Sequence, residues 1–197
     1  MSKVICGLAV SVDGYITGRE PGPGHGLGDG GALFDWYGSG DVPSRVFDGF
    51  RLTEPSARIF DELASRVGAT LAGHTTYTDS NRFAEGAPHP TAPLVVLSRS
   101  DFPPANPRQT IVSTGIDDAV DVAKRAADGK DVGLMGGVLV TEALAAGLVD
   151  ELILHQVPIL LGAGRRFFHD LPRHIRLGIL EVVAAPDVTH LHYEVKR

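Results

Sequence analysis

Two adjacent glycines, Gly136 and Gly137, stand between a short apolar segment and a run of helix-forming residues. Residues 131–135 suit a buried strand, and residues 138–146 are rich in the alanine and leucine that favour helices. Because glycine has no Cβ, a ligand can approach this backbone closely, and the free N–H groups at the positive end of the helix favour a phosphate. The same glycines also suit tight packing of strand against helix, and the sequence leaves both interpretations open.

Hydroxyl and guanidinium groups follow two other predicted strands. The segment Gly73-His-Thr-Thr-Tyr77 offers Thr75 as the N-cap of a helix and Thr76 beside it, and both hydroxyls could donate to a phosphate. Ser98 and Arg99 follow another apolar strand, where a guanidinium could hold an adenosine 2′-phosphate through paired hydrogen bonds. Capping is the alternative role for the threonines, and simple exposure to solvent is the alternative for the arginine.

Two aspartates could supply a proton. Asp13 ends an apolar run, and burial there would raise its pKa into the range of a usable acid. A turn before Gly14 is the alternative role for this side chain. Asp35-Trp-Tyr37 combines an acid with two rings that could stack on a flat heterocycle, whereas ordinary packing of the loop would explain the same rings.

The elements that must position these residues alternate between short strands and helices. The last two strands are separated only by residues 184–187, so they must form a hairpin. This order predicts an α/β fold with a mixed, mostly parallel sheet flanked by helices and a C-terminal antiparallel hairpin. We expect strands at 4–12, 69–72, 93–98, 110–113, 131–135, 151–158, 176–183 and 188–196, and helices at 56–67, 117–127 and 138–146.

Four polar or glycine-rich segments come directly after predicted parallel strands. Ligands of α/β proteins bind at the carboxyl ends of such strands. Four segments converging on one sheet edge therefore predict a cleft large enough for a dinucleotide. These segments are residues 11–15, 73–77, 98–100 and 136–137.

Composition limits the class of protein. The 197 residues fit one domain, which we expect to span 1–197. The formal net charge of −6 and the lack of a basic tract argue against nucleic acid as a partner. The single cysteine, Cys6, excludes an intrachain disulfide and a cysteine-based zinc cluster. No run reaches the ~18 apolar residues of a membrane span, so we expect a cytoplasmic protein with no membrane partner.

Three further features invite interpretation. Gly26-Leu-Gly-Asp-Gly-Gly31 fits G-x-G-x-x-G but lies far from the preceding strand and opens no clear helix, so we reject it as a dinucleotide motif. It belongs to a long glycine-rich loop, residues 14–40, of a length that is typical of functional or mobile loops. His190 and His192 share one strand face without an evident third ligand, so we expect a sheet surface there rather than a metal site.

In their order and spacing these segments resemble the dihydrofolate reductase-like superfamily. The similarity is to the branch typified by the C-terminal reductase domain of the bacterial riboflavin-biosynthesis deaminase-reductase, and it covers almost the whole chain. The resemblance implies a mixed sheet with an antiparallel C-terminal hairpin, NADPH binding, hydride transfer and frequent dimers. It is carried by Ser11-Val-Asp-Gly-Tyr-Ile16, Gly73-His-Thr-Thr-Tyr77, Val95-Val-Leu-Ser-Arg99, Gly136-Gly137, Gly147-Leu-Val-Asp-Glu-Leu152 and Pro158-Ile-Leu-Leu-Gly-Ala-Gly164.

The sequence departs from this family in two places. His74 stands where the family usually has arginine or lysine after the glycine, which leaves Arg99 as the main phosphate contact. The insertion at residues 18–40 is long, so the substrate of a relative does not carry over. The zinc deaminase signature, H-x-E with P-C-x-x-C, is absent from the sequence.

These observations predict an NADPH-dependent reductase that transfers hydride to a small heterocyclic or carbonyl substrate. The alternative is a non-catalytic nucleotide-binding or sensing protein of the same fold. The nicotinamide would lie near residues 10–13, and Asp13 or Asp35 would supply the proton, directly or through water. The apolar segment Leu148–Leu161 and the C-terminal hairpin predict a homodimer, and no metal is expected. The residues expected to bind the cofactor are Gly73, His74, Thr75, Thr76, Ser98, Arg99, Gly136, Gly137 and Val138.

Overall fold

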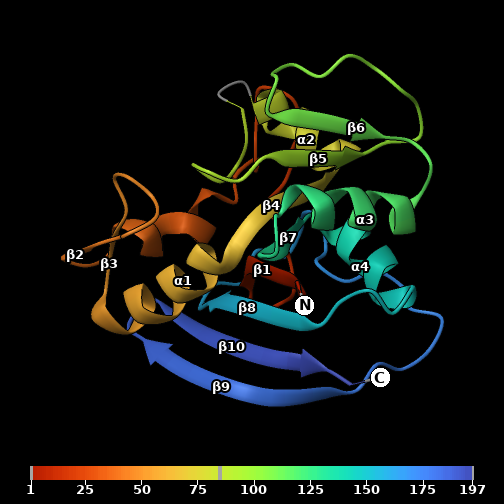
Figure 1. Ribbon diagram of the computed structural model, residues 1–197. Helices are drawn as coiled ribbons and strands as arrows, with labels where there is room; N and C mark the ends of the chain where they lie inside the picture. The colour runs from red at the N-terminus through yellow and green to blue at the C-terminus, as the bar shows by residue number, and fades with distance from the viewer. Residues whose placement is uncertain (1, 84–85, 197) are drawn as a thin grey trace.

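A computed structural model describes residues 2–83 and 86–196 and shows strands alternating with helices (Figure 1). The strands are β1 (Val4–Ser11), β2 (Val42–Pro43), β3 (Arg51–Leu52), β4 (Val67–Gly73), β5 (Leu94–Leu97), β6 (Gln109–Val112), β7 (Asp131–Met135), β8 (Glu151–Val157), β9 (Leu177–Ala185) and β10 (Val188–Val195). The helices are α1 (Glu54–Arg66), α2 (His74–Asp79), α3 (Ile116–Ala126) and α4 (Gly137–Ala145), with short 3-10 helices η1 (Gly31–Gly38) and η2 (Asn81–Phe83).

Eight strands form one sheet in the order β6-β5-β4-β7-β1-β8-β10-β9. The strands from β6 to β8 run parallel, whereas β10 pairs antiparallel with both β8 and β9. The predicted fold class is therefore confirmed. Differences at element ends are small: α1 begins two residues before the predicted start because Thr53 is its N-cap and a proline occupies its first turn.

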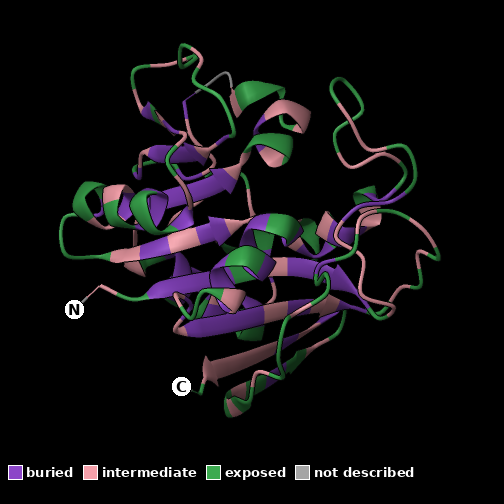
Figure 2. Cartoon of the chain, turned by 90° about the vertical axis from the view of Figure 1, so that its right-hand side faces the viewer, coloured by how far each residue is buried: buried purple, intermediate pink, exposed green. Residues whose placement is uncertain are grey.

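Alternation of side chains along β1 builds a core on each side of the sheet. Val4, Cys6 and Val10 face α3 and α4, which form what we call the back face. Ile5 packs with residues of α1, and Ala9 packs with residues of η1, on what we call the front face. Figure 2 shows the buried central strands between these layers. Cys6 is fully buried, and burial raises the pKa of its thiol, as expected for an unreactive cysteine.

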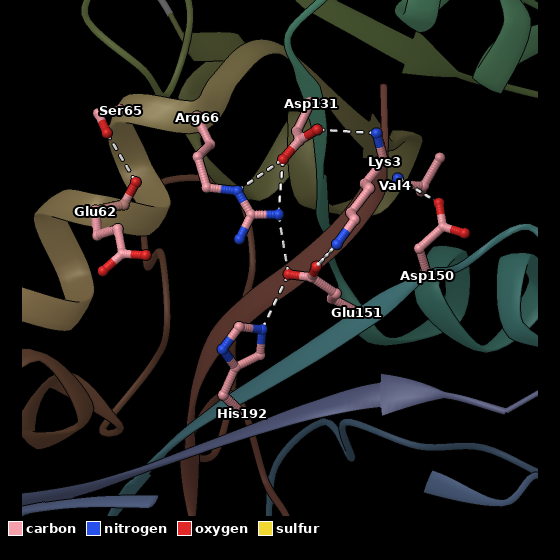
Figure 3. A network of polar contacts seen from close by, with 9 residues as sticks. All are labelled: Lys3, Val4, Glu62, Ser65, Arg66, Asp131, Asp150, Glu151 and His192. Carbon is pink, nitrogen blue, oxygen red and sulfur yellow. Dashed lines mark hydrogen bonds and ion pairs between the residues drawn. The ribbon is translucent and has the colours of Figure 1, made fainter. Parts of the chain in front are cut away.

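An ionic network ties the amino ends of several strands together (Figure 3). Glu151 of β8 is only 3% exposed and accepts hydrogen bonds from Lys3, from His192 Nε2 at 2.9 Å and from Arg66 Nη2 at 2.9 Å. Arg66 also pairs with Asp131 at 2.8 Å, which links α1 to β7. Burial by itself raises the pKa of Glu151, but the hydrogen bonds from Lys3 and His192 and the charge of Arg66 outweigh it and lower the pKa overall. This satisfied cluster holds the sheet at the end opposite the candidate site.

Candidate active site

The four predicted binding segments lie at one edge of the sheet. Strands β5, β4, β7 and β1 are consecutive in the sheet and parallel, although they are far apart in the sequence. Their carboxyl ends lead into Ser98, His74, Gly136 and Val12, respectively. Three interstrand steps of about 4.8 Å each separate the outer two strands, about 14 Å in total. This edge is wide enough for an extended dinucleotide.

The glycine pair lies at the turn from β7 into α4. Gly136 has φ +97°, and a Cβ there would lie 2.3 Å from Thr76 Oγ1. A Cβ at Gly137 would lie 2.5 Å from the carbonyl oxygen of Arg166 and 2.6 Å from that of Phe167. Protein atoms therefore fill the space beside both glycines, which supports the packing interpretation. The N-terminal end of α4 is still accessible to a ligand, because no side chain caps it and Val138 in its first turn is 64% exposed.

Helix α2 begins directly after β4. Its N-cap is Gly73 in an extended conformation, so the prediction that Thr75 caps the helix is wrong. His74 and Thr75 are exposed at the sheet edge, and Thr76 is half-buried against Gly136. The strand continues one residue further than the sequence pattern suggested, which shifts the helix start to His74.

Ser98 and Arg99 differ in their surroundings. Ser98 is 7% exposed, and its Oγ accepts a hydrogen bond from the Ser100 N–H at 3.3 Å. Arg99 is exposed and has no ion-pair partner within the described part of the chain. The guanidinium therefore remains available to a ligand at this edge, whereas the serine mainly holds its own turn.

Asp13 is ionised, which corrects the expectation of a raised pKa. Its carboxylate accepts hydrogen bonds from Ser11 Oγ at 2.6 Å, from the Gly162 N–H at 2.7 Å and from the Leu161 N–H at 3.1 Å. The Ser11 hydroxyl and these two N–H groups hold the pKa of Asp13 at about 2. Asp13, after the end of β1, thus contacts a loop that donates hydrogen bonds to it, and among the described residues no apolar pocket surrounds it. An ionised carboxylate has no proton to donate at neutral pH.

The rings after Asp35 belong to the core. Trp36 is 1% exposed and packs against Tyr37 and Phe60, with ring centroids 4.3 and 5.4 Å apart. Among the described residues, no group accepts a hydrogen bond from the buried Trp36 Nε1. Asp35 itself is exposed. The expected stacking platform is therefore wrong for Trp36, because the long loop folds back through η1 and buries this side chain on the front face.

Sequence reasoning missed a pair of buried histidines. His190 is fully buried, so the expected sheet surface is wrong at this position. Its Nδ1 lies 2.7 Å from Nδ1 of His155 on the neighbouring strand β8, and its Nε2 lies 2.9 Å from Ser56 Oγ. Burial lowers the pKa of His155 to about 3 and that of His190 to about 4, so both rings are neutral at neutral pH. The sequence signal that could have predicted this pair is the histidine at the end of the apolar run Leu152-Ile-Leu-His155.

No cluster of three or more His, Cys, Asp or Glu that could hold a metal occurs in residues 2–83 and 86–196. Over the same residues, no helix is both long enough and apolar enough to cross a membrane.

The mixed sheet with its C-terminal hairpin and open carboxyl edge defines a dihydrofolate reductase-like α/β protein. The family model for the RibD C-terminal domain matches residues 2–191, so the chain belongs to that family. The protein is accordingly an oxidoreductase. No curated protein matches the chain.

Several solved structures share this fold. A protein named for riboflavin biosynthesis from Shewanella sp. PV-4 is 23% identical, with a TM-score of 0.70 and 100% of both chains covered. A pyrimidine reductase-like protein from Corynebacterium diphtheriae is 17% identical, with a TM-score of 0.63 over 100% of this chain and 92% of the other. The chain also spans 57% of a Thermotoga maritima diaminohydroxyphosphoribosylaminopyrimidine deaminase/5-amino-6-(5-phosphoribosylamino)uracil reductase, at 12% identity and a TM-score of 0.62.

Proposed function

We propose that this protein is an NADPH-dependent reductase that transfers hydride to a small heterocycle of the pyrimidine class. The observation that carries the proposal is the order β5-β4-β7-β1, which brings four ligand-binding segments to one edge of the sheet. Family membership supports the class of reaction. The similarity to the pyrimidine reductase-like protein of Corynebacterium diphtheriae and to the deaminase/reductase of Thermotoga maritima supports a pyrimidine as substrate.

The edge offers a separate feature for each part of NADPH. Arg99, which has no ion-pair partner among the described residues, would hold the 2′-phosphate. The uncapped start of α4 at Gly137 would accept the pyrophosphate, with the Thr75 hydroxyl exposed nearby. Val12, 53% exposed after β1, would give a bound ligand an apolar surface. NADPH supplies the hydride, and the protein orients it and delivers a proton.

We propose that Asp13 positions a loop of the site. Because its carboxylate is ionised, it fixes residues 161–162 at the end of β1 and shapes this part of the site. The proton for the substrate must then come from another side chain or from water.

We also propose that the protein works as a homodimer. The centre of the predicted apolar segment Leu148–Leu161 is β8, an inner strand between β1 and β10, although Leu160 beyond its end is 72% exposed. The edge strand β9 is different: Ile179, Val182 and Leu180 are 71%, 54% and 50% exposed. An uncovered apolar edge strand is a site for pairing with another chain, and a second copy would cover it.

The test is an anaerobic titration with NADPH and, separately, with NADH, followed by measurement of NADPH oxidation with a ribosylaminouracil phosphate. We expect NADPH to bind more tightly than NADH and to be oxidised only when the pyrimidine is added. NADPH binding without oxidation by any pyrimidine would favour the non-catalytic nucleotide-binding alternative. A lack of binding to either cofactor would refute both.

A further inference from the structure

The front face of the sheet is uncovered at one point in the middle of its central strand. Gly7 of β1 is exposed, although Ile5 and Ala9 on the same face are buried. Met135 of the adjacent strand β7 is only half-buried, and it directly precedes Gly136 at the proposed cofactor edge. This opening, which we call the Gly7 hollow, therefore lies beside the end of β7, next to the turn where the pyrophosphate would bind.

His155 borders the Gly7 hollow. A Cβ at Gly7 would lie 3.5 Å from His155 Nε2 and 3.8 Å from the Cβ of Ile153. The missing glycine side chain thus leaves this ring nitrogen open to a small ligand. Within the described chain Nε2 of His155 has no hydrogen-bond partner, whereas Nδ1 of the same ring contacts His190. A substrate placed over Gly7 would meet Nε2.

A chain of hydrogen bonds connects this imidazole to the N-terminal end of α1. His155 Nδ1 lies 2.7 Å from His190 Nδ1, and His190 Nε2 lies 2.9 Å from Ser56 Oγ. Thr53 Oγ1 donates to Ser56 Oγ at 3.0 Å, and Thr53 is only half-buried. The four side chains therefore form one path from solvent to the Gly7 hollow.

The hydrogen bonds along this path determine which ring nitrogen of each histidine carries the proton. Two neutral rings whose Nδ1 atoms are 2.7 Å apart share a single proton between them. Because Thr53 donates to Ser56, the Ser56 proton points to His190 Nε2. His190 then carries its proton on Nδ1 and donates it to His155 Nδ1. His155 must carry its own proton on Nε2, toward the hollow. A neutral imidazole can serve as such a donor.

We propose that His155 is the catalytic proton donor of this reductase and that His190, Ser56 and Thr53 form the relay that replaces its proton. The inference rests on the proposed function. A bound NADPH would supply hydride to the carbon of a C=N or C=O group. The nitrogen or oxygen of that group, which gains the bonding electron pair, would take the proton from His155 Nε2. His155 Nδ1 takes the proton from His190 Nδ1, His190 Nε2 takes one from Ser56, Ser56 takes one from Thr53, and Thr53 takes one from water.

The net reaction consumes one hydride and one solvent proton. After the product leaves, water in the Gly7 hollow returns a proton to His155 Nε2, and the reverse transfers restore the original tautomers. The substrate class that fits is a flat heterocycle with a C=N or C=O acceptor, narrow enough to lie against a glycine backbone. The relay also accounts for the source of the proton, since Asp13 is ionised.

The first test needs no substrate. Nitrogen-15 NMR of the imidazoles in the wild-type protein at neutral pH should show His155 with its proton on Nε2 and His190 with its proton on Nδ1. A through-bond coupling across the two Nδ1 atoms should accompany these shifts. Protonation of both rings on Nε2, or of either ring on both nitrogens, would overturn the relay.

The second test compares variants with saturating NADPH and a ribosylaminouracil phosphate, under single-turnover conditions for the hydride-transfer rate and in the steady state for turnover and KM. His155→Phe should leave the NADPH dissociation constant unchanged and slow hydride transfer by roughly 10²–10⁴-fold. Thr53→Val, which replaces the hydroxyl with a methyl group, should slow turnover without changing KM and should alter the solvent deuterium isotope effect. Thr53→Ser, which keeps the hydroxyl, should behave like wild type in both. His192→Gln, on the same strand face as His190 but outside the path, serves as the control and should behave like wild type.

The outcomes separate the two proposals. Absence of NADPH binding or oxidation in the wild type would refute the proposed function, while the NMR result would still decide whether the proton path exists. Wild-type oxidation that persists at full rate in His155→Phe would leave the reductase intact and refute the role of His155.

Discussion

Gly136 and Thr76 occupy the same small space at the carboxyl edge of the sheet: a Cβ at Gly136 would lie 2.3 Å from Thr76 Oγ1. The contact joins the start of α4 to the first turn of α2 and so fixes the two helix ends relative to each other. It also explains why a glycine is needed at position 136, whose φ of +97° disfavours any residue with a side chain.

Gly136→Ala should weaken NADPH binding at least tenfold and lower the free energy of unfolding by about 1–3 kcal/mol. The added methyl group displaces Thr76 and strains the backbone. Calorimetric titration and urea unfolding measure the two effects. Thr76→Ala in the same background should recover part of the loss, because it removes the clash and leaves the strain. Unchanged NADPH affinity in Gly136→Ala would contradict a binding role for this turn.

Arg99→Ala should reduce the preference for NADPH over NADH. An arginine–phosphate pair at an exposed edge contributes on the order of 1–3 kcal/mol, or roughly tenfold to a hundredfold in affinity. NADH affinity should stay the same, because NADH has no 2′-phosphate. Arg173→Ala, which removes another exposed arginine from a distant loop, is the control. Equal loss of affinity for both cofactors in Arg99→Ala would show that the arginine does not contact the 2′-phosphate.

Asp13→Asn should change loop structure and leave the pH profile of turnover unchanged between about pH 5 and pH 8. The wild-type carboxylate is already ionised there, since its pKa is about 2. The amide can still accept one of the two backbone hydrogen bonds, so residues 161–162 should loosen. Faster hydrogen exchange of the Leu161 and Gly162 amides would show this. Loss of an acidic or basic limb from the pH–rate profile would instead return a proton-transfer role to Asp13.

The protein should lose stability as the pH falls below about 6.5. His155 and His190 have folded-state pKa values of about 3 and 4, well below the unfolded value of 6.5, so the unfolded chain binds more protons in this range. Each buried histidine then removes up to about 1.4 kcal/mol of stability per pH unit. Glu151, whose pKa is lowered in the fold, contributes a separate loss only below its unfolded value of 4.5.

Urea unfolding at about pH 7.5, 6 and 5 measures this dependence, because these values lie above and below the unfolded histidine pKa of about 6.5. The double variant His155→Phe/His190→Phe should show a flatter decline than wild type. It should not become flat, because burial also lowers the pKa of His89. An equally steep decline in the double variant would show that these two rings are not buried as neutral groups.

Ile179→Glu should shift the protein from dimer to monomer at micromolar concentration in sedimentation equilibrium. Ile179 is 71% exposed on the edge strand β9, and a charge there would be buried in any pairing through this edge. Val138→Glu, at a residue 64% exposed on α4, which contacts β7, β4 and α3, is the matched control and should remain dimeric. A wild-type protein that is monomeric throughout would refute the dimer.

The sequence by itself determined the alternation of strands and helices, the C-terminal hairpin and the four segments that follow the parallel strands. Those features depend on local signals: apolar runs, glycines at element ends and short connections. The same local signals placed the N-cap of α2 two residues too late and gave no means to distinguish Gly136 as a packing position from Gly136 as a phosphate position.

Only the tertiary structure decided what each polar side chain meets. Asp13 is ionised because a loop 148 residues later in the chain donates hydrogen bonds to it, which reverses the pKa shift that burial would give. His155 and His190 are 35 residues apart in sequence and become partners only because β8 and β10 pair in register. The charge of an ionisable group depends on its neighbours in space, and the order of strands in the sheet, which no local pattern encodes, determines those neighbours.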